Sequence, residues 1–222
     1  MPDIRPKYVT FDCYGTLTWF RIGEVTRGLM ADRVPESRME AFLRDYNWYR
    51  FDQVLGPWAP YVDVLKASLE RTCRRHGVPF READGQAIYE AVPSWGPHPD
   101  VPAPLKRVAA RYPLVILSNA SDDQIVKNAA LLEAPFHRIY TAQQAQAYKP
   151  RMQAFEYMFD MLGCGPEDVL HVSASYRYDI IPAYGLRVAN TLYVNRGYEP
   201  EIPFYGAHQT TTIEGLAKLL GV

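Results

Sequence analysis

The chain has 222 residues, 48% of them hydrophobic and 22% charged, and its 24 Lys and Arg nearly balance its 25 Asp and Glu. This length suits one large domain, or a core domain with a smaller insertion. The near-neutral charge argues against nucleic-acid binding, and the lack of an apolar run of about 18 residues argues against a membrane span. The N-terminus lacks the apolar segment of a secretory signal, and three scattered cysteines form no CxxC pair. We therefore expect a cytoplasmic protein with free thiols.

The first expected element is a buried strand over Tyr8–Phe11, with the sequence YVTF. Residues 18–96 then contain no run that is typical of a buried strand. Two long amphipathic patterns predict helices there, at Ser37–Tyr49 and Tyr61–His76. The proline-rich stretch VPSWGPHPDVPAP, residues 92–104, should be irregular and act as a hinge or seam. The sequence thus predicts a helical domain over residues 18–96, inserted into a core domain made of residues 1–17 and 97–222.

Strands and helices alternate after the insertion. Short apolar runs predict buried parallel strands, because such strands are hydrophobic on both faces. These strands are expected at Leu114–Leu117, Val169–Val172 and Asn190–Val194, with Arg138–Tyr140 as a further candidate. The intervening periodic segments predict helices at Asp122–Leu132, Arg151–Leu162, Asp179–Gly185 and Thr212–Leu220. This alternation indicates an α/β domain with a mostly parallel sheet.

Polar side chains follow the predicted strands at their carboxyl ends, where open parallel sheets bind ligands. They are Asp12, Tyr14 and Thr16 after the strand at Tyr8–Phe11, Ser118 and Asn119 after the strand at Leu114–Leu117, and Ser173, Ser175 and Asp179 after the strand at Val169–Val172. Lys149 lies in a loop ahead of a predicted helix that leads to the next strand. Two carboxylates, one lysine and several hydroxyl or amide groups should therefore meet at one edge of the sheet.

The residue types at this edge indicate their roles. A carboxylate that is aimed and stripped of water can attack a substrate, so Asp12 is the candidate nucleophile. A neighbouring Lys149 would keep Asp12 ionised. Asp179 could hold Lys149 or activate a water in a second step. Hydrogen bonds to a substrate carboxylate could come from Thr16, Ser118 and Asn119.

Each residue also has a purely structural interpretation when taken alone. Asp12 could cap a helix, Lys149 could be an ordinary surface lysine, and Cys13 is best explained as a small packed residue. The five histidines show no metal-ligand spacing, and we interpret all of them as structural: His76, His98, His137, His171 and His208. The combined order of polar residues at strand ends outweighs these separate interpretations.

Four segments in this order resemble the motifs of the haloacid dehalogenase superfamily: FDCYGTL (11–17), LSNA (117–120), AYKP (147–150) and VSASYRYDI (172–180). The first segment is similar to that of the type II 2-haloacid dehalogenase branch. The resemblance implies a Rossmann-like core with a helical cap inserted after the first motif. It also implies that Asp12 attacks a carbon next to a carboxylate, forming an ester that water then hydrolyses. The matching positions are Thr16, Ser118, Asn119, Lys149 and Asp179, whereas Ser173 and Ser175 match less cleanly.

The phosphatases of this superfamily carry an acid two residues after the nucleophile and another early in the fourth motif. Here these positions hold Tyr14 and Ala174. With so few oxygen ligands Mg²⁺ would bind poorly, so we expect no metal and no other cofactor. A Mg²⁺-dependent phosphatase and an inactive protein that binds small molecules remain the alternatives.

Several features depart from the 2-haloacid dehalogenases. The usual Arg-x-Lys-Gln run of the cap is absent, and Phe155 stands where a tyrosine commonly follows the motif lysine. Trp19 directly follows the first motif and could line the pocket with Tyr14, and aromatic faces suit a cationic group better than a halide. Two reactions on a small-molecule substrate therefore carry about equal weight: L-2-haloacid dehalogenation, and ring-opening hydrolysis of L-azetidine-2-carboxylate, which a superfamily member performs. The resemblance also makes a homodimer an expectation.

Overall fold

The computed structural model describes residues 4–222, and the chain divides into two compact units. One unit joins the residues up to Trp19 with Gly96–Val222, and the other is Phe20–Trp95. The sequence predicted divisions after residues 17 and 96, and the structure divides after residues 19 and 95. The backbone N–H of Trp19 donates to the carbonyl oxygen of Gly96 at 3.0 Å, so the two ends of the insertion meet within the first unit.

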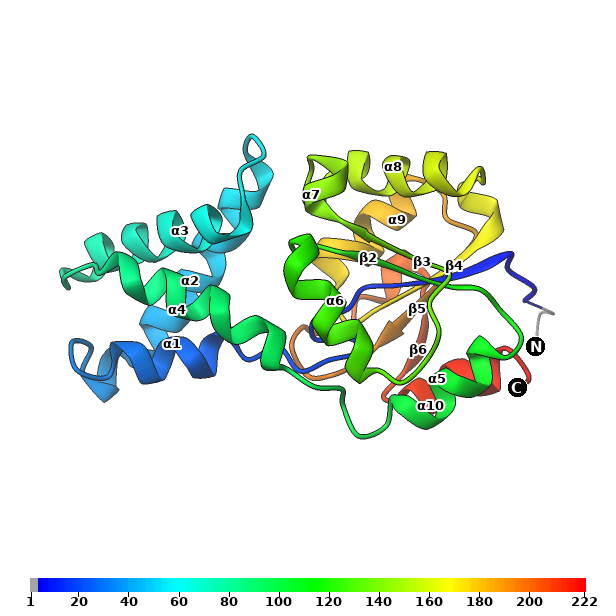
Figure 1. The fold of residues 1–222 in the computed structure, drawn as a ribbon, viewed down its shortest axis with the longest axis horizontal. Helices are drawn as coiled ribbons and strands as arrows, with labels where there is room; N and C mark the ends of the chain where they lie inside the picture. Colours follow the sequence, from blue (N-terminus) through cyan, green and yellow to red (C-terminus); the bar gives the residue numbers. More distant parts are fainter. Residues whose placement is uncertain (1–3) are drawn as a thin grey trace. The chain divides into compact units, whose positions relative to one another are not determined.

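The first unit is built on a parallel sheet of six strands, in the order β3-β2-β1-β4-β5-β6, within the described part of the chain (Figure 1). The strands are β1 (Tyr8–Phe11), β2 (Leu114–Ser118), β3 (Arg138–Thr141), β4 (Val169–Ser173), β5 (Asn190–Val194) and β6 (His208–Thr210). The α/β fold and its parallel sheet are therefore confirmed. The edge strand β6 was not predicted, because its residues His-Gln-Thr lack the apolar run that marks the other strands.

Helices cover both faces of this sheet, as an all-parallel sheet requires. Val9 and Phe11 belong to a core cluster with residues of α5 and α10, while Val115 and Leu117 belong to another with residues of α8 and α9. Figure 1 shows these two pairs of helices on opposite faces of the sheet. The helices of this unit are α5 (Pro102–Ala109), α6 (Asp122–Leu131), α7 (Ala142–Ala145), α8 (Met152–Leu162), α9 (Ile181–Gly185) and α10 (Ile213–Leu219). Short helical turns are η2 (Pro166–Asp168), the π-helical η3 (Tyr176–Ile180) and η4 (Pro203–Tyr205).

Two expectations for these helices need correction. The proline-rich stretch is not wholly irregular, because α5 begins inside it at Pro102. Proline suits the first turn of a helix, since its fixed φ is helical and no N–H partner is needed there. The segment expected as one helix over Asp179–Gly185 is instead η3 followed by α9, so Asp179 lies on a π-helical turn rather than at a helix start.

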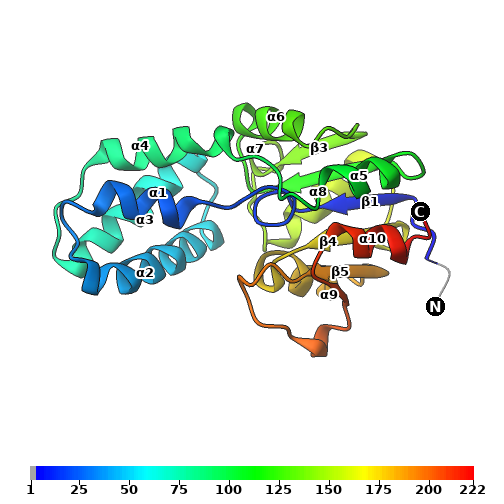
Figure 2. The same ribbon diagram turned by 90° about the horizontal axis from the view of Figure 1, so that it is seen from below.

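The second unit consists of helices packed on one another, with no strand in Phe20–Trp95, as predicted (Figure 2). They are α1 (Ile22–Met30), α2 (Glu36–Leu55), α3 (Tyr61–His76) and α4 (Glu82–Ala91), followed by the turn η1 (Val92–Ser94). Helix α3 has its predicted bounds, and α2 extends beyond its prediction. The sequence did not predict α1 or α4. In α4, Gly85 lowers helix propensity, but a Cβ at this position would lie 2.6 Å from the Cγ of Lys66, so glycine permits close packing on α3.

Many aromatic residues of the second unit are part of its own packing. Phe42 and Tyr46 are fully buried, and the guanidinium carbon of Arg50 lies 5.3 Å from the ring centroids of both Phe20 and Tyr46. Arg50 is 7% exposed and donates to the side-chain oxygen of Asn47. Stacking on two rings compensates for burying its charge. In the described part of the chain, no helix combines the length and apolarity that crossing a bilayer would need.

Candidate active site

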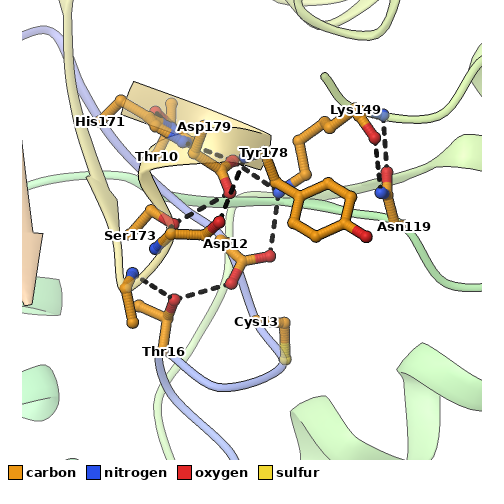
Figure 3. Close-up of polar contacts among 12 residues, drawn as sticks. Thr10, Asp12, Cys13, Thr16, Asn119, Lys149, His171, Ser173, Tyr178 and Asp179 are labelled. Atoms are coloured by element: carbon orange, nitrogen blue, oxygen red, sulfur yellow. Dashed lines mark hydrogen bonds and ion pairs between the residues drawn. The ribbon is translucent and has the colours of Figure 1, made fainter. Parts of the chain in front are cut away.

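Three charged side chains meet at the carboxyl edge of the sheet (Figure 3). Asp12 follows β1, Asp179 lies on η3 after β4, and Lys149 precedes α8. The ammonium nitrogen Nζ of Lys149 lies 2.9 Å from Oδ1 of Asp12 and 2.6 Å from Oδ1 of Asp179. The Asp179 side chain is 0% exposed and that of Asp12 is 13% exposed. Of the two carboxylates, Asp12 is the one that a small molecule can reach.

The turn after β1 places Thr16 beside Asp12. The N–H groups of Leu17 and Thr18 donate to the carbonyl oxygen of Cys13, and Gly15 adopts a φ of 89°, which glycine tolerates best. The Thr16 hydroxyl donates to Asp12 Oδ2 at 2.7 Å and accepts the backbone N–H of Ala174 at 2.9 Å. Each oxygen of the Asp12 carboxylate thus accepts a hydrogen bond, which fixes its plane.

Two residues at the end of β2 lie next to this cluster. The Asn119 amide donates to the backbone oxygen of Lys149 at 2.8 Å and accepts its N–H at 2.7 Å. Asn119 therefore holds the Lys149 backbone in place, whereas the sequence suggested that it orients a substrate. Ser118 is 1% exposed, and its hydroxyl has no hydrogen-bond partner within residues 4–222. An incoming polar group could use this hydroxyl, because a buried donor without a partner is costly.

Asp179 is held from three sides within the described structure. Its Oδ2 accepts the Ser173 hydroxyl at 2.9 Å, and its Oδ1 accepts both Lys149 and Nε2 of His171, the latter at 3.0 Å. His171, which the sequence analysis interpreted only as a structural residue, therefore contacts this cluster directly. The sequence carried a signal for it: His171 is the one polar residue in the apolar run VLHV, and it lies two residues before Ser173, on the same face of β4.

Ser175 has a different role from the other predicted residues. Its hydroxyl donates to Oε1 of Glu199 at 2.7 Å and accepts the N–H of Tyr178, so it caps the start of η3. Glu199, which the sequence did not identify, also accepts the backbone N–H groups of Tyr176 and Arg177 through Oε2. These contacts anchor the turn that carries Asp179, because they satisfy N–H groups that a helix start leaves unpaired.

The two aromatic candidates make contacts away from the charged cluster. The Tyr14 hydroxyl donates to the side-chain oxygen of Asn128 on α6 at 2.8 Å. The Trp19 ring is 38% exposed and its centroid lies 4.2 Å from that of His98. Burial and the positive charge of Arg196 lower the pKa of His98. The structure thus brings Asp12, Thr16, Lys149, Ser173 and Asp179 together, and places Tyr14 and Trp19 beside them in the sequence but on other partners.

Charge and burial set the protonation of the cluster. Burial raises the pKa of Asp12; the Lys149 ammonium opposes this shift and the charge on Asp179 adds to it. Burial alone would also raise the pKa of Asp179, but Lys149 and the His171 hydrogen bond lower it below the ordinary value. The pKa of Lys149 is raised, because both carboxylates outweigh the cost of its burial. Burial raises the pKa of the Cys13 thiol, so Cys13 is a poor nucleophile.

In residues 4–222 no group of three or more His, Cys, Asp and Glu side chains is arranged to hold a metal ion. The two positions at which related phosphatases carry acids, Tyr14 and Ala174, offer no carboxylate. Lys149 supplies the positive charge that contacts both carboxylates.

Comparison with known proteins agrees with this geometry. Residues 6–183 match the family model of the haloacid dehalogenase-like hydrolases. The (S)-2-haloacid dehalogenase 4A of Burkholderia cepacia is 27% identical over 223 residues, covering 95% of this chain and 93% of that protein. An (S)-2-haloacid dehalogenase of Xanthobacter autotrophicus is 28% identical over 185 residues, covering 76% of this chain and 68% of that protein.

Solved structures share the fold over nearly the whole chain. The L-2-haloacid dehalogenase of Xanthobacter autotrophicus with covalently bound chloropropionic acid superposes with a TM-score of 0.77, at 18% identity and over 98% of this chain and 99% of that chain. A magnesium-bound hydrolase of the same superfamily from Bacillus subtilis gives a TM-score of 0.82 at 16% identity, over 99% and 100% of the two chains. With a family model that spans most of its residues and this fold, the chain belongs to the haloacid dehalogenase-like hydrolases.

Proposed function

We propose that this chain is a metal-independent hydrolase of small 2-substituted carboxylic acids, and that Asp12 forms the covalent ester. The proposal rests above all on one observation: Asp12 is the reachable carboxylate of the cluster, with one oxygen bound by Thr16 and the other by Lys149. These contacts aim the remaining lone pairs. Burial, which raises the pKa of Asp12, also makes its carboxylate a better nucleophile, because less water must be removed before it attacks.

In the first step an oxygen of Asp12 bonds to the carbon next to the substrate carboxylate, and the leaving group departs with the electron pair of its bond. Ester formation removes one negative charge from a buried cluster of two carboxylates and one ammonium. Burial is the largest cause of the raised pKa of Asp12 and disfavours its charged form. Ester formation relieves this cost and the repulsion from Asp179, loses the attraction of Lys149, and leaves Lys149 to balance Asp179 alone. Because burial dominates, the loss of this charge favours the displacement.

In the second step water attacks the ester carbon of Asp12, which frees the carboxylate and releases a 2-hydroxy acid and a proton. Lys149 lies where it can stabilise negative charge on the ester oxygen. Of the two roles considered for Asp179, we assign it that of holding Lys149, because Asp179 is fully buried and its oxygens already accept hydrogen bonds from Lys149, His171 and Ser173. The Ser118 hydroxyl, buried and without a partner in residues 4–222, is suited to the substrate carboxylate.

A halide is the first candidate for the leaving group, since the curated relatives at 27% and 28% identity are (S)-2-haloacid dehalogenases. The second candidate is the ring amine of L-azetidine-2-carboxylate. It is favoured by the lack of the Arg-x-Lys-Gln run, whose arginine helps to hold the halide in the enzymes that this chain resembles. Trp19 supplies a partly exposed aromatic face next to the first motif, which suits an ammonium group.

Purified protein should be incubated with L-2-chloropropionate and, separately, with L-azetidine-2-carboxylate, with excess EDTA present. Release of chloride or formation of 2-hydroxy-4-aminobutyrate identifies the leaving group, and Asp12→Asn should abolish either reaction. In a single turnover in ¹⁸O-labelled water, the label should enter the Asp12 carboxylate and not the product, because the hydroxyl oxygen of the product comes from Asp12. Turnover of p-nitrophenyl phosphate that depends on Mg²⁺ would instead support a phosphatase. Binding of these acids without any turnover would support a non-catalytic protein.

A further inference from the structure

His171 is a buried ionisable group that the two steps above do not use. It is 0% exposed and lies on β4, directly paired in register with Thr10 of β1. Its Nε2 lies 3.0 Å from Oδ1 of Asp179, and its Nδ1 lies 2.8 Å from the Thr10 hydroxyl oxygen (Figure 3). Both ring nitrogens therefore have a polar partner in an otherwise apolar part of the sheet.

These contacts determine the tautomer of a neutral His171. The ionised carboxylate of Asp179 can only accept, so the hydrogen must be on Nε2. The lone pair is then on Nδ1, and the Thr10 hydroxyl donates to it. The Phe155 ring packs edge-on against the imidazole, with ring centroids 5.2 Å apart, and restricts its rotation. Thr10 and Phe155 thus hold the imidazole so that Nε2–H is aimed at Asp179.

Asp179 connects His171 to Lys149, the cation of the site. The same oxygen, Oδ1, accepts from both His171 and Lys149, and Lys149 contacts Asp12 in turn. We propose that His171 is a positioning residue, whose Nε2–H donor orients the Asp179 carboxylate and through it sets the place of Lys149 Nζ beside Asp12. This inference rests on the proposed function for its effect on catalysis, but its structural part concerns the free protein alone.

The structural part can be tested without substrate. Nitrogen-15 NMR of the imidazole, with the His171 signal identified by its loss in His171→Phe, should show the Nε2–H tautomer in the wild-type protein. Thr10→Ser keeps the hydroxyl and should keep this tautomer. Thr10→Val removes the hydroxyl that donates to Nδ1 and should perturb the Nδ1 signal. A signal from the Nδ1–H tautomer, or one averaged between the two tautomers, would overturn the proposal.

The catalytic part is tested by comparing two substitutions. His171→Phe keeps an aromatic ring of similar size but has no donor, and should lower kcat roughly 10- to 100-fold because Lys149 is misplaced. KM should stay nearly unchanged, since His171 does not contact the substrate. His171→Gln retains an N–H donor and should recover part of kcat, and His208→Gln on the edge strand β6 is the matched control.

These measurements separate the two hypotheses. Full kcat in a folded His171→Phe protein would sink the positioning role even if the wild-type enzyme hydrolyses the proposed substrates. Equal losses in His171→Phe and His171→Gln would show that packing, not the donor, matters. If the wild-type protein hydrolyses neither substrate, the proposed function fails, while the tautomer measurement still decides the role of His171.

Discussion

The Thr16 hydroxyl donates to Oδ2 of Asp12 at 2.7 Å, and both residues lie in the short segment that follows β1. The same hydroxyl accepts the backbone N–H of Ala174, which begins the segment leading to Asp179. One side chain therefore joins Asp12, the proposed nucleophile, to the segment that carries the second carboxylate. Arg196 supports this turn by donating to the carbonyl oxygen of Thr16 at 3.1 Å and pairing with Asp100.

Thr16→Val should impair both activity and stability. The substitution keeps the side-chain shape but removes the donor to Asp12 and the acceptor for Ala174, and a buried N–H without a partner costs about 1–3 kcal/mol. We expect a large fall in kcat and a lower urea midpoint, measured by product formation and circular dichroism. Thr16→Ser retains the hydroxyl and should stay close to wild type. Equal activity of the two variants would contradict the role of the hydroxyl.

Asp12→Asn should inactivate the protein without destabilising it at neutral pH. Burial raises the pKa of Asp12 in the folded state above its ordinary value. Its ionisation therefore lowers the free energy of unfolding as pH rises from about 4, the ordinary carboxylate pKa, through the raised folded-state pKa. Asparagine avoids this charge and should leave the urea midpoint at pH 7 equal to or above that of wild type. A clearly lower midpoint would mean that the ion pair with Lys149 outweighs burial.

The acid limb of the activity profile should reflect the same shift. Asp12 must be ionised to attack, so kcat/KM should fall as pH drops through a value above the ordinary carboxylate pKa. A profile of kcat/KM from pH 4 to 9 measures this limb in the free enzyme. The Thr16 hydrogen bond lowers the pKa of Asp12, and its removal in Thr16→Val should move the limb to higher pH. A limb at or below pH 4 would contradict this prediction.

Lys149→Met should be the most destabilising change in the site. It leaves two buried carboxylates without their cation, and breaking a buried ion pair costs about 3–5 kcal/mol. Because the pKa of Lys149 is raised in the folded state, its stabilisation is complete below about pH 10.4, the ordinary lysine value, and is lost as pH rises through the raised pKa. Urea midpoints from pH 7 to 11 should fall for wild type at the alkaline end and change less for the variant.

Asp179→Asn tests the opposite end of the pH range. The pKa of Asp179 is lowered in the folded state, so its stabilisation is present above about pH 3.9 and is lost as pH falls through the lower folded value. The variant should be less stable than wild type at pH 7, and the difference should shrink in acid. Thermal unfolding between pH 2.5 and 7 follows this change, and a constant difference over that range would argue against an ionised Asp179.

Much of the site was predictable from the sequence, because physical rules connect residue order to position. Apolar runs marked the central strands, and the carboxyl ends of parallel strands share one edge, so Asp12 and Asp179 had to be neighbours. Lys149 was expected there from its loop, and the structure places it between them. The roles of these residues in a reaction stay predictions until the proposed assays are made.

Other features could not be predicted, for identifiable reasons. A histidine inside an apolar strand is usually a packed residue, and only the pairing of β1 with β4 places Thr10 beside His171. Glu199 reaches η3 from a loop after β5 that has no periodic pattern. The true partner of Asn119 is the Lys149 backbone, a contact that residue type alone does not reveal. Helix α4 was not predicted because Gly85 lowers helix propensity. The close packing on α3 that glycine permits can be seen only in the folded structure.

The hydrogen bond between Trp19 and Gly96 holds together the two points at which the chain leaves and re-enters the first unit, so the inserted unit begins and ends at one place. Lengthening a chain segment whose ends already meet costs little additional entropy. The residues proposed for the displacement belong to the first unit, and the sheet that supports them is continuous without the inserted unit. The length of the inserted unit can therefore change without breaking the sheet that carries the proposed site.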